Sequence, residues 1–130
     1  MNRIIKLFNL RGLTTWVLIL SFGLNLGLTL LLFTTITAWL NQRGGWMEGV
    51  DIFLILGMFF ISALVGFGVT LLARDGRGAS YGVLGAIGGF MLVIVLMYQS
   101  GLLAVIVSLT ALLGGYNGGM LGESSIRRRR

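Results

Sequence analysis

Side chains able to catalyse reactions are scarce in this chain. Its 130 residues include no Cys and no His, which removes thiolate nucleophiles, the commonest general base and the commonest metal ligand. The four acids form no obvious catalytic pair: Glu48, Asp51, Asp75 and Glu123. We therefore expect no enzymatic activity, no cofactor and no metal site.

Glycine, with 21 residues, is concentrated in two late apolar stretches. On a helix at ~100° per residue, the glycines of 82–89 share an arc of ~120° and those of 114–122 an arc of ~140°. Such faces let helix backbones approach closely, which drives association in lipid, although each glycine costs ~1 kcal/mol of helix propensity. We predict a helix-packing or interaction role for Gly82, Gly85, Gly88, Gly89, Gly114, Gly115, Gly118, Gly119 and Gly122.

The sequence leaves open what these glycine faces contact. Packing of the last two stretches on each other, with Gly66 and Gly68 nearby, is the favoured interpretation. A homodimer interface, a groove for a helix of another protein and a cavity lined by backbone are the alternatives.

Four uncharged polar residues fall within the apolar stretches. Ser21, Asn25 and Thr29 recur every four residues and so share one helix face, while Asn117 lies in the last glycine run. Hydrogen bonds between helices, worth ~0.6–2 kcal/mol each, are the favoured role. The alternative is the polar lining of a solute path, although no charge at mid-membrane offers a proton carrier.

The composition places all of these residues in lipid. The chain is 56% hydrophobic and 11% charged, whereas soluble domains carry ~25% charged residues. About 20 apolar residues cross the hydrocarbon core as a helix. We predict one all-α membrane domain over 1–130, a four-helix bundle with spans at 13–40, 50–73, 79–98 and 100–122 and a basic tail at 123–130. The first apolar stretch is too long for the ~7–15-residue core of a cleavable signal peptide, the competing interpretation.

Lys and Arg predict the orientation. Three lie before the first span, two between the second and third, and four in the tail, whereas the other side has only Arg43. This bias places both termini in the cytoplasm, and we expect a bacterial cytoplasmic (inner) membrane. Residues 3–9 separate polar from apolar side chains and predict a short interfacial helix. The tail is expected to contact anionic lipid.

The stretch from Leu64 to Glu123 resembles a family of small, uncharacterised four-span bacterial membrane proteins. The resemblance rests on Gly66-Phe67-Gly68, the basic loop 74–78, Tyr81-Gly82 and the closing run of Gly114-Gly115, Gly118-Gly119 and Gly122. It implies a four-span, glycine-rich fold. Because the family has no assigned activity, it implies no catalytic or binding residue.

Two functions fit these observations. The favoured one is a non-enzymatic scaffold or accessory subunit that associates through its glycine-rich helix faces. The alternative is a small homo-oligomeric, holin-like pore or transporter whose Ser21–Asn25–Thr29 face lines a water path. The expected partners are the lipid bilayer and either other membrane subunits or further copies of the chain. Nucleic acid is not expected, because the basic residues lie at the termini and between apolar stretches.

Overall fold

The computed structural model describes residues 15–45, 48–74 and 76–129. Within these ranges the chain is all-helical and contains four long helices: α2 (Thr15–Arg43), α3 (Val50–Ala73), α4 (Gly78–Met97) and α5 (Leu102–Arg129). Each helix is long and apolar enough to cross a membrane, which confirms the predicted four-span, all-α fold. The predicted interfacial helix at 3–9 and the predicted start of the first span lie outside the described residues.

Glycines end or redirect the helices at two of the turns. After α2, Gly44 and Gly45 have φ values of 88° and 129°, and the Gly45 amide donates to Leu40 O at 2.9 Å. Such a glycine beyond the last turn satisfies free helix carbonyls without a Cβ penalty. Between α4 and α5, a 3-10 turn, η1 (Tyr98–Ser100), leads to Gly101 at φ 59°. The last two spans therefore form a tight hairpin.

The last helix continues beyond the predicted fourth span. Residues 123–129, expected as a basic tail beyond the fourth span, continue α5 without a break. Glu123 and Arg127 form an ion pair one turn apart at 2.9 Å, and Ser124 Oγ donates to Met120 O at 2.9 Å. Arginines in a last turn also interact favourably with the helix dipole. A charged sequence outside the apolar stretch thus remains helical.

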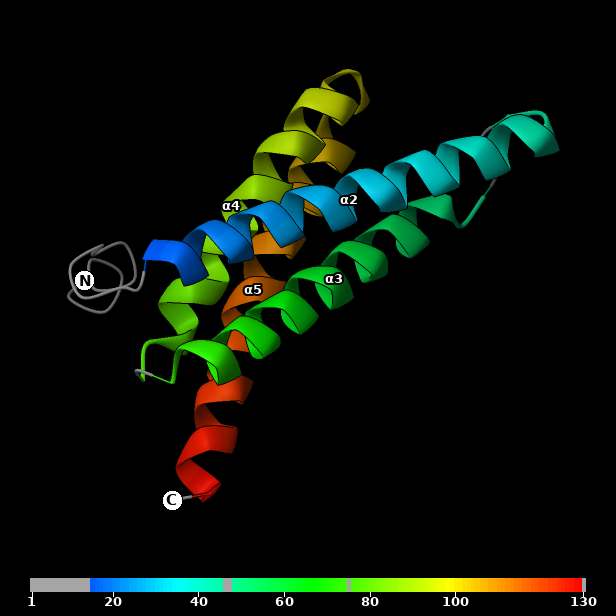
Figure 1. Cartoon of the computed structure of the whole chain (residues 1–130). Coiled ribbons are helices and arrows are strands. Elements are labelled where there is room, and N and C mark those ends of the chain that lie inside the picture. The colour runs from blue at the N-terminus through cyan, green and yellow to red at the C-terminus, as the bar shows by residue number, and fades with distance from the viewer. Residues whose placement is uncertain (1–14, 46–47, 75, 130) are drawn as a thin grey trace.

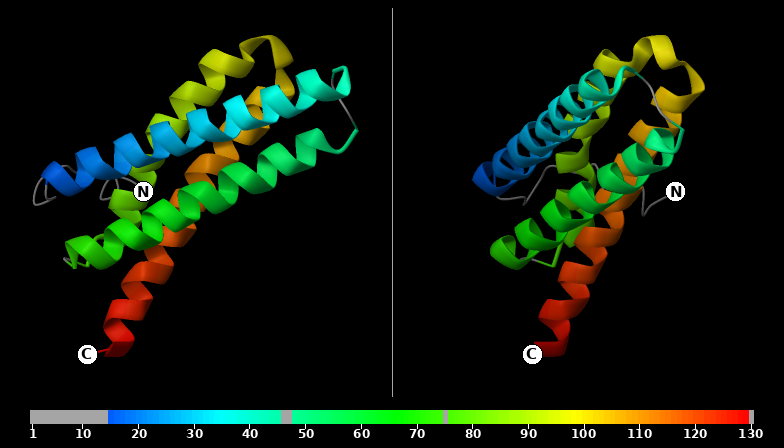
Figure 2. Two further views of the ribbon diagram at one scale, coloured as in Figure 1. Left: turned by 45° about the vertical axis from the view of Figure 1, so that its right-hand side comes forward. Right: turned by 90° about the vertical axis from the view of Figure 1, so that its right-hand side faces the viewer.

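The helices form two crossed pairs. Helices α2 and α3 lie side by side, and the α4–α5 hairpin crosses them obliquely (Figures 1 and 2). Among the described residues, α5 packs against both α3 and α4, whereas α2 packs on α4 and α3 and makes no contact with α5. Helix α2 is thus the peripheral member of the bundle.

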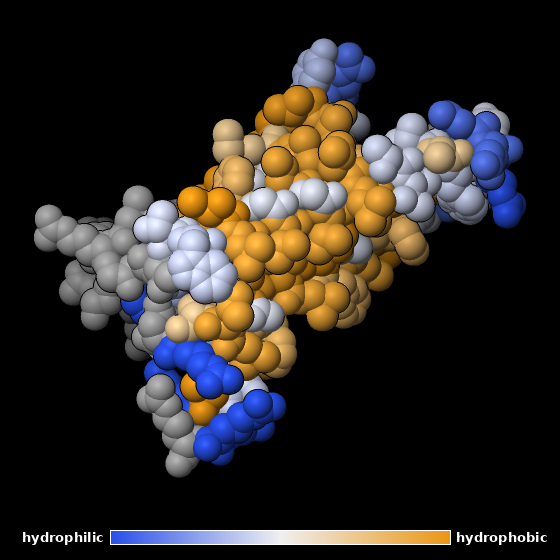
Figure 3. Space-filling view, viewed as in Figure 1, coloured by the Kyte–Doolittle hydropathy of each residue, from blue (hydrophilic) through white to orange (hydrophobic). Residues whose placement is uncertain are grey.

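Polar residues gather at opposite ends of the molecule. Figure 3 shows an apolar belt around the middle of the visible face, with hydrophilic side chains at its two ends. The α3–α4 turn lies near the end of α5, and the α2–α3 connection and η1 lie away from it (Figure 1). This arrangement suits helices that cross a bilayer. The end that carries Arg74, Arg77 and the arginines of α5 is called the basic end below.

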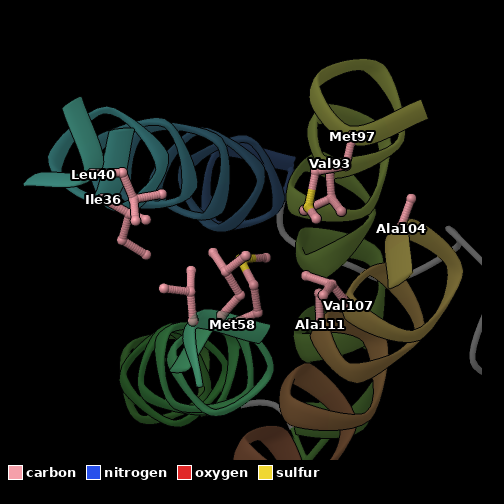
Figure 4. Packing of buried hydrophobic residues seen from close by; sticks show 10 residues of the cluster. Ile36, Leu40, Met58, Val93, Met97, Ala104, Val107 and Ala111 are labelled. Atoms are coloured by element: carbon pink, nitrogen blue, oxygen red, sulfur yellow. The ribbon is translucent and has the colours of Figure 1, made fainter. Parts of the chain in front are cut away.

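Apolar residues form two clusters in the interior. One cluster collects side chains from all four helices (Figure 4), and it consists of Ile36, Leu40, Val50, Leu54, Met58, Val93, Met97, Ala104, Val107 and Ala111. The second lies nearer the basic end and consists of Val17, Val65, Val69 and Tyr81. Tyr81, the largest fully buried side chain, is 0% exposed. Glycines and small polar residues lie between the clusters.

Met58→Ala is expected to destabilise the protein by about 2 kcal/mol or more, because a buried Met→Ala change leaves a cavity that the surroundings fill only partly. The Met58 side chain is 0% exposed. The measurement is the free energy of unfolding in detergent micelles, followed by helical circular dichroism. Phe60→Ala is the control, because Phe60 is 60% exposed. Equal losses in both variants would contradict the packing described for α3.

Candidate functional site

The glycine face of α5 lies between two other helices. A Cβ at Gly114 or Gly118 would overlap the backbone carbonyls of Phe59 and Ala63 in α3. One at Gly115 would overlap a carbonyl of α4 in the same way, and so would one at Gly119. Gly122 returns to α3, where its Cβ would lie 2.8 Å from Thr70 Cβ. Because these glycines point to two sides, α5 approaches both neighbours at backbone distance.

The glycines of α4 also divide between two neighbours. Gly82 contacts α5, since a Cβ there would overlap Gly115 O. The other three face α2: a Cβ at Gly85 would overlap Ser21 Oγ, while those at Gly88 and Gly89 would lie 2.9 Å from Phe22 O and 3.0 Å from Thr29 Oγ1. The arc of glycines read from the sequence as one face therefore serves two different helix contacts.

Three helices meet at a single point of backbone contact. A Cβ on Gly66 of α3 would lie 2.7 Å from Gly115 O and 3.4 Å from Gly82 Cα. Gly68, grouped with Gly66 in the sequence, instead has open space around its Cβ position. We call Gly66, Gly82 and Gly115 the glycine junction. It joins α3, α4 and α5 where no side chain separates them.

All nine predicted glycines are buried, and each has atoms of another helix within 4 Å of its Cβ position. These faces therefore have no room for a second chain while the bundle keeps this arrangement. Outward-facing glycines occur elsewhere, on α2. Gly23 and Gly27 are exposed and have nothing within 4 Å, and at ~100° per residue they lie opposite the face of Ser21, Asn25 and Thr29.

The polar face of α2 is closed within the bundle. Ser21, Asn25 and Thr29 are each 0% exposed and lie against the glycines of α4. Ser21 Oγ donates to Tyr81 O at 3.2 Å, which joins α2 to α4. Asn25 Nδ2 donates to Ser21 O at 3.0 Å within its own helix. Of the three predicted polar residues, one thus forms a hydrogen bond between helices.

Several buried oxygens have no hydrogen-bond partner within the part of the chain that the structure describes. They are Asn25 Oδ1, Thr29 Oγ1 and Ser62 Oγ. The Cβ position of Gly89 lies 3.0 Å from Thr29 Oγ1 and 3.4 Å from Met58 Cε. Met58 is one helical turn from Ser62 in α3. Such groups are costly in a water-free interior. We call Asn25, Thr29 and Ser62 the polar layer.

Asn117 is not part of this layer. Its side chain is exposed, and Nδ2 donates to Leu113 O at 2.8 Å along α5. At ~100° per residue it falls outside the glycine arc of α5, and α2 does not contact α5 in the described structure. The structure therefore does not bring Asn117 together with Ser21, Asn25 and Thr29, the four residues of the alternative polar lining, within one chain.

Sequence reasoning missed the matching face of α3. Ser62, Gly66 and Thr70 recur every four residues, all are buried, and Thr70 Oγ1 donates to Gly66 O at 2.6 Å. This spacing equals that of Ser21, Asn25 and Thr29 and was the signal available. Helix α3 therefore contributes Gly66 to the glycine junction and Ser62 to the polar layer.

The described residues contain no group of three or more His, Cys, Asp or Glu that could hold a metal ion. No family model matches the chain, and no curated protein and no solved structure is significantly similar to it. The candidate site is thus a helix-packing centre, the glycine junction beside the polar layer, and its chemistry is close contact and hydrogen bonding.

Gly118→Ala is expected to destabilise the protein by about 1–3 kcal/mol, because the added methyl group meets the backbone of Ala63 and overpacking forces the helices apart. Gly27→Ala is the matched control. Its methyl group meets nothing within 4 Å, so it should gain up to ~1 kcal/mol of helix propensity. The free energy of unfolding of both variants is measured in micelles. A change of the same sign in both variants would contradict the assigned contacts.

Thr29→Val should stabilise the protein by about 1 kcal/mol, since it replaces an unpartnered buried hydroxyl with a methyl group of similar shape. Thr70→Val should destabilise it by a similar amount, because Thr70 Oγ1 loses its bond to Gly66 O. The same unfolding measurement applies. A loss in Thr29→Val as large as that in Thr70→Val would show that the Thr29 hydroxyl has a partner in the bilayer.

Proposed function

We propose that this protein is a non-enzymatic scaffold or accessory subunit, which associates with other proteins inside a bacterial inner membrane and has both termini in the cytoplasm. The excess of Lys and Arg on one side supports this orientation. We also propose that the chain is a member of the glycine-rich four-span family that its sequence resembles. Four apolar helices make the chain a multi-pass membrane protein.

The exposed side of α2 carries the proposal. Helix α2 is the least buried of the four helices: only 22% of its most apolar 18-residue stretch is buried. Gly23 and Gly27 at the centre of its exposed side contact nothing in the described chain, yet each costs ~1 kcal/mol of helix propensity. Close approach of a transmembrane helix from another subunit would offset that cost. The nine buried glycines build the bundle, whereas this outward pair, like Gly68 of α3, is open to association.

The connections between helices support association within the membrane. They comprise only residues 44–49, 74–77 and 98–101, too few to form a folded receptor or substrate domain in water. The surface that these four helices offer to another protein therefore consists mainly of helix sides. Recognition by shape and close packing is the mechanism such a surface allows.

The alternative function, a small homo-oligomeric pore or transporter, is supported by the polar layer. Asn25 Oδ1, Thr29 Oγ1 and Ser62 Oγ are buried without a partner in the described structure, as expected for groups that meet water or solute in another state. Because all three residues are 0% exposed, such a path requires α2 to move away from α3 and α4. Its test is solute flux in liposomes, abolished by Asn25→Leu.

Gentle extraction of the tagged protein from its own membranes, followed by determination of mass and composition, tests the proposed function. We expect stoichiometric co-purification of other membrane subunits. Gly27→Leu should abolish this co-purification while leaving insertion and helix content intact, because the Cβ position is open within the chain. A pure homo-oligomer in the native extract would contradict the accessory role and favour the pore.

A further inference from the structure

A pocket of about 350 Å³ lies at the basic end, between the ends of α3 and α5. In the described part of the chain, two apolar and two cationic residues line it: Leu71, Arg74, Ile126 and Arg129. The apolar residues are half-buried and the arginines are exposed. One apolar and one cationic residue come from the end of α3 and the position that follows it, and one of each kind comes from α5, so the pocket exists only where the two helix ends lie together.

Local backbone structure sets the position of Arg74. It follows the last residue of α3 and has left-handed dihedral angles, φ 54° and ψ 27°. Its amide caps the helix by donating to Thr70 O at 3.1 Å, and its Nε donates to Leu71 O at 3.3 Å. These two bonds hold the guanidinium beside the end of α3, next to Leu71.

The part of α5 beyond the predicted fourth span supplies the other two residues of the pocket. Because residues 123–129 are helical, Ile126 and Arg129 stand three positions apart and share one helix side. Glu123, the one acid of α5, is paired with Arg127 at 2.9 Å. The residues of the described chain that line the pocket include no acid. The pocket therefore presents two cations over an apolar base.

This combination matches one class of ligand in a bilayer. Guanidinium groups bind phosphate oxygens through paired hydrogen bonds, and basic pockets between membrane helices hold anionic lipid headgroups. Leu71 and Ile126 offer contact to acyl chains on the membrane side. We propose that this pocket binds an anionic phospholipid, with Arg74 and Arg129 on its phosphate and its acyl chains along Leu71 and Ile126.

The test measures binding of phosphatidylglycerol and of phosphatidylcholine to the full-length protein in detergent micelles at 150 mM salt, where exposed charges are screened. We expect preference for phosphatidylglycerol, and about tenfold weaker binding in Arg74→Asn and in Arg129→Gln. Asn suits position 74 because it tolerates left-handed backbone. Arg128→Gln is the matched control: it removes the same charge from a neighbouring exposed position that does not line the pocket, and it should change binding less than twofold.

Three outcomes would overturn the proposal. Equal losses in all three variants would indicate general attraction to a basic surface, and equal binding of both lipids would remove the role of charge. Inorganic phosphate that competes as strongly as the lipid would indicate a small-anion site. Circular dichroism of each variant separates loss of binding from loss of folding, and Arg74→Lys, which keeps the charge, should bind more tightly than Arg74→Asn.

Discussion

Contact between helix backbones at the glycine junction is the constraint on which the rest of the structure depends. Lipid is as apolar as a protein interior, so the hydrophobic effect does little to hold membrane helices together. Dispersion contacts replace it, and they require atoms within a few tenths of an ångström of contact distance. At Gly66, Gly82 and Gly115 any side chain would separate α3, α4 and α5. The crossed arrangement of the two helix pairs follows from that point.

Helix α2 is held by a different kind of contact. Ser21 gives it one hydrogen bond to α4. The Asn25 amide donates only within α2, and Thr29 Oγ1 lies against Gly89 without a partner in the described structure. Because a hydrogen bond in a membrane contributes only ~0.6–2 kcal/mol, α2 is attached less firmly than α3, α4 and α5 are attached to one another. Both proposed functions depend on this difference, since either α2 receives another subunit or it moves.

The sequence was sufficient for the four spans, because length and hydropathy decide which segments lipid accepts. The sequence did not indicate which neighbouring helix each helix face contacts. The glycines of α4 formed one arc, but a helix inside a bundle has neighbours on several sides, so Gly82 and Gly85 serve different helices. Asn117 was grouped with glycines beside it in sequence, whereas helical rotation turns it outward. Residues 123–129 are predicted only as a basic tail, because hydropathy marks where an apolar stretch ends and does not mark where a helix ends.

The buried glycines also determine how this protein can diverge. Any amino-acid substitution at Gly115 or Gly118 introduces at least a methyl group where a carbonyl already lies. Exposed residues such as Leu64 and Val95 can instead exchange among apolar types. Substitutions should therefore accumulate on the exposed apolar surface. The glycine positions, and with them the number of residues between glycines, should stay unchanged. Descendants of one ancestor would then keep a common spacing after most identities had been lost.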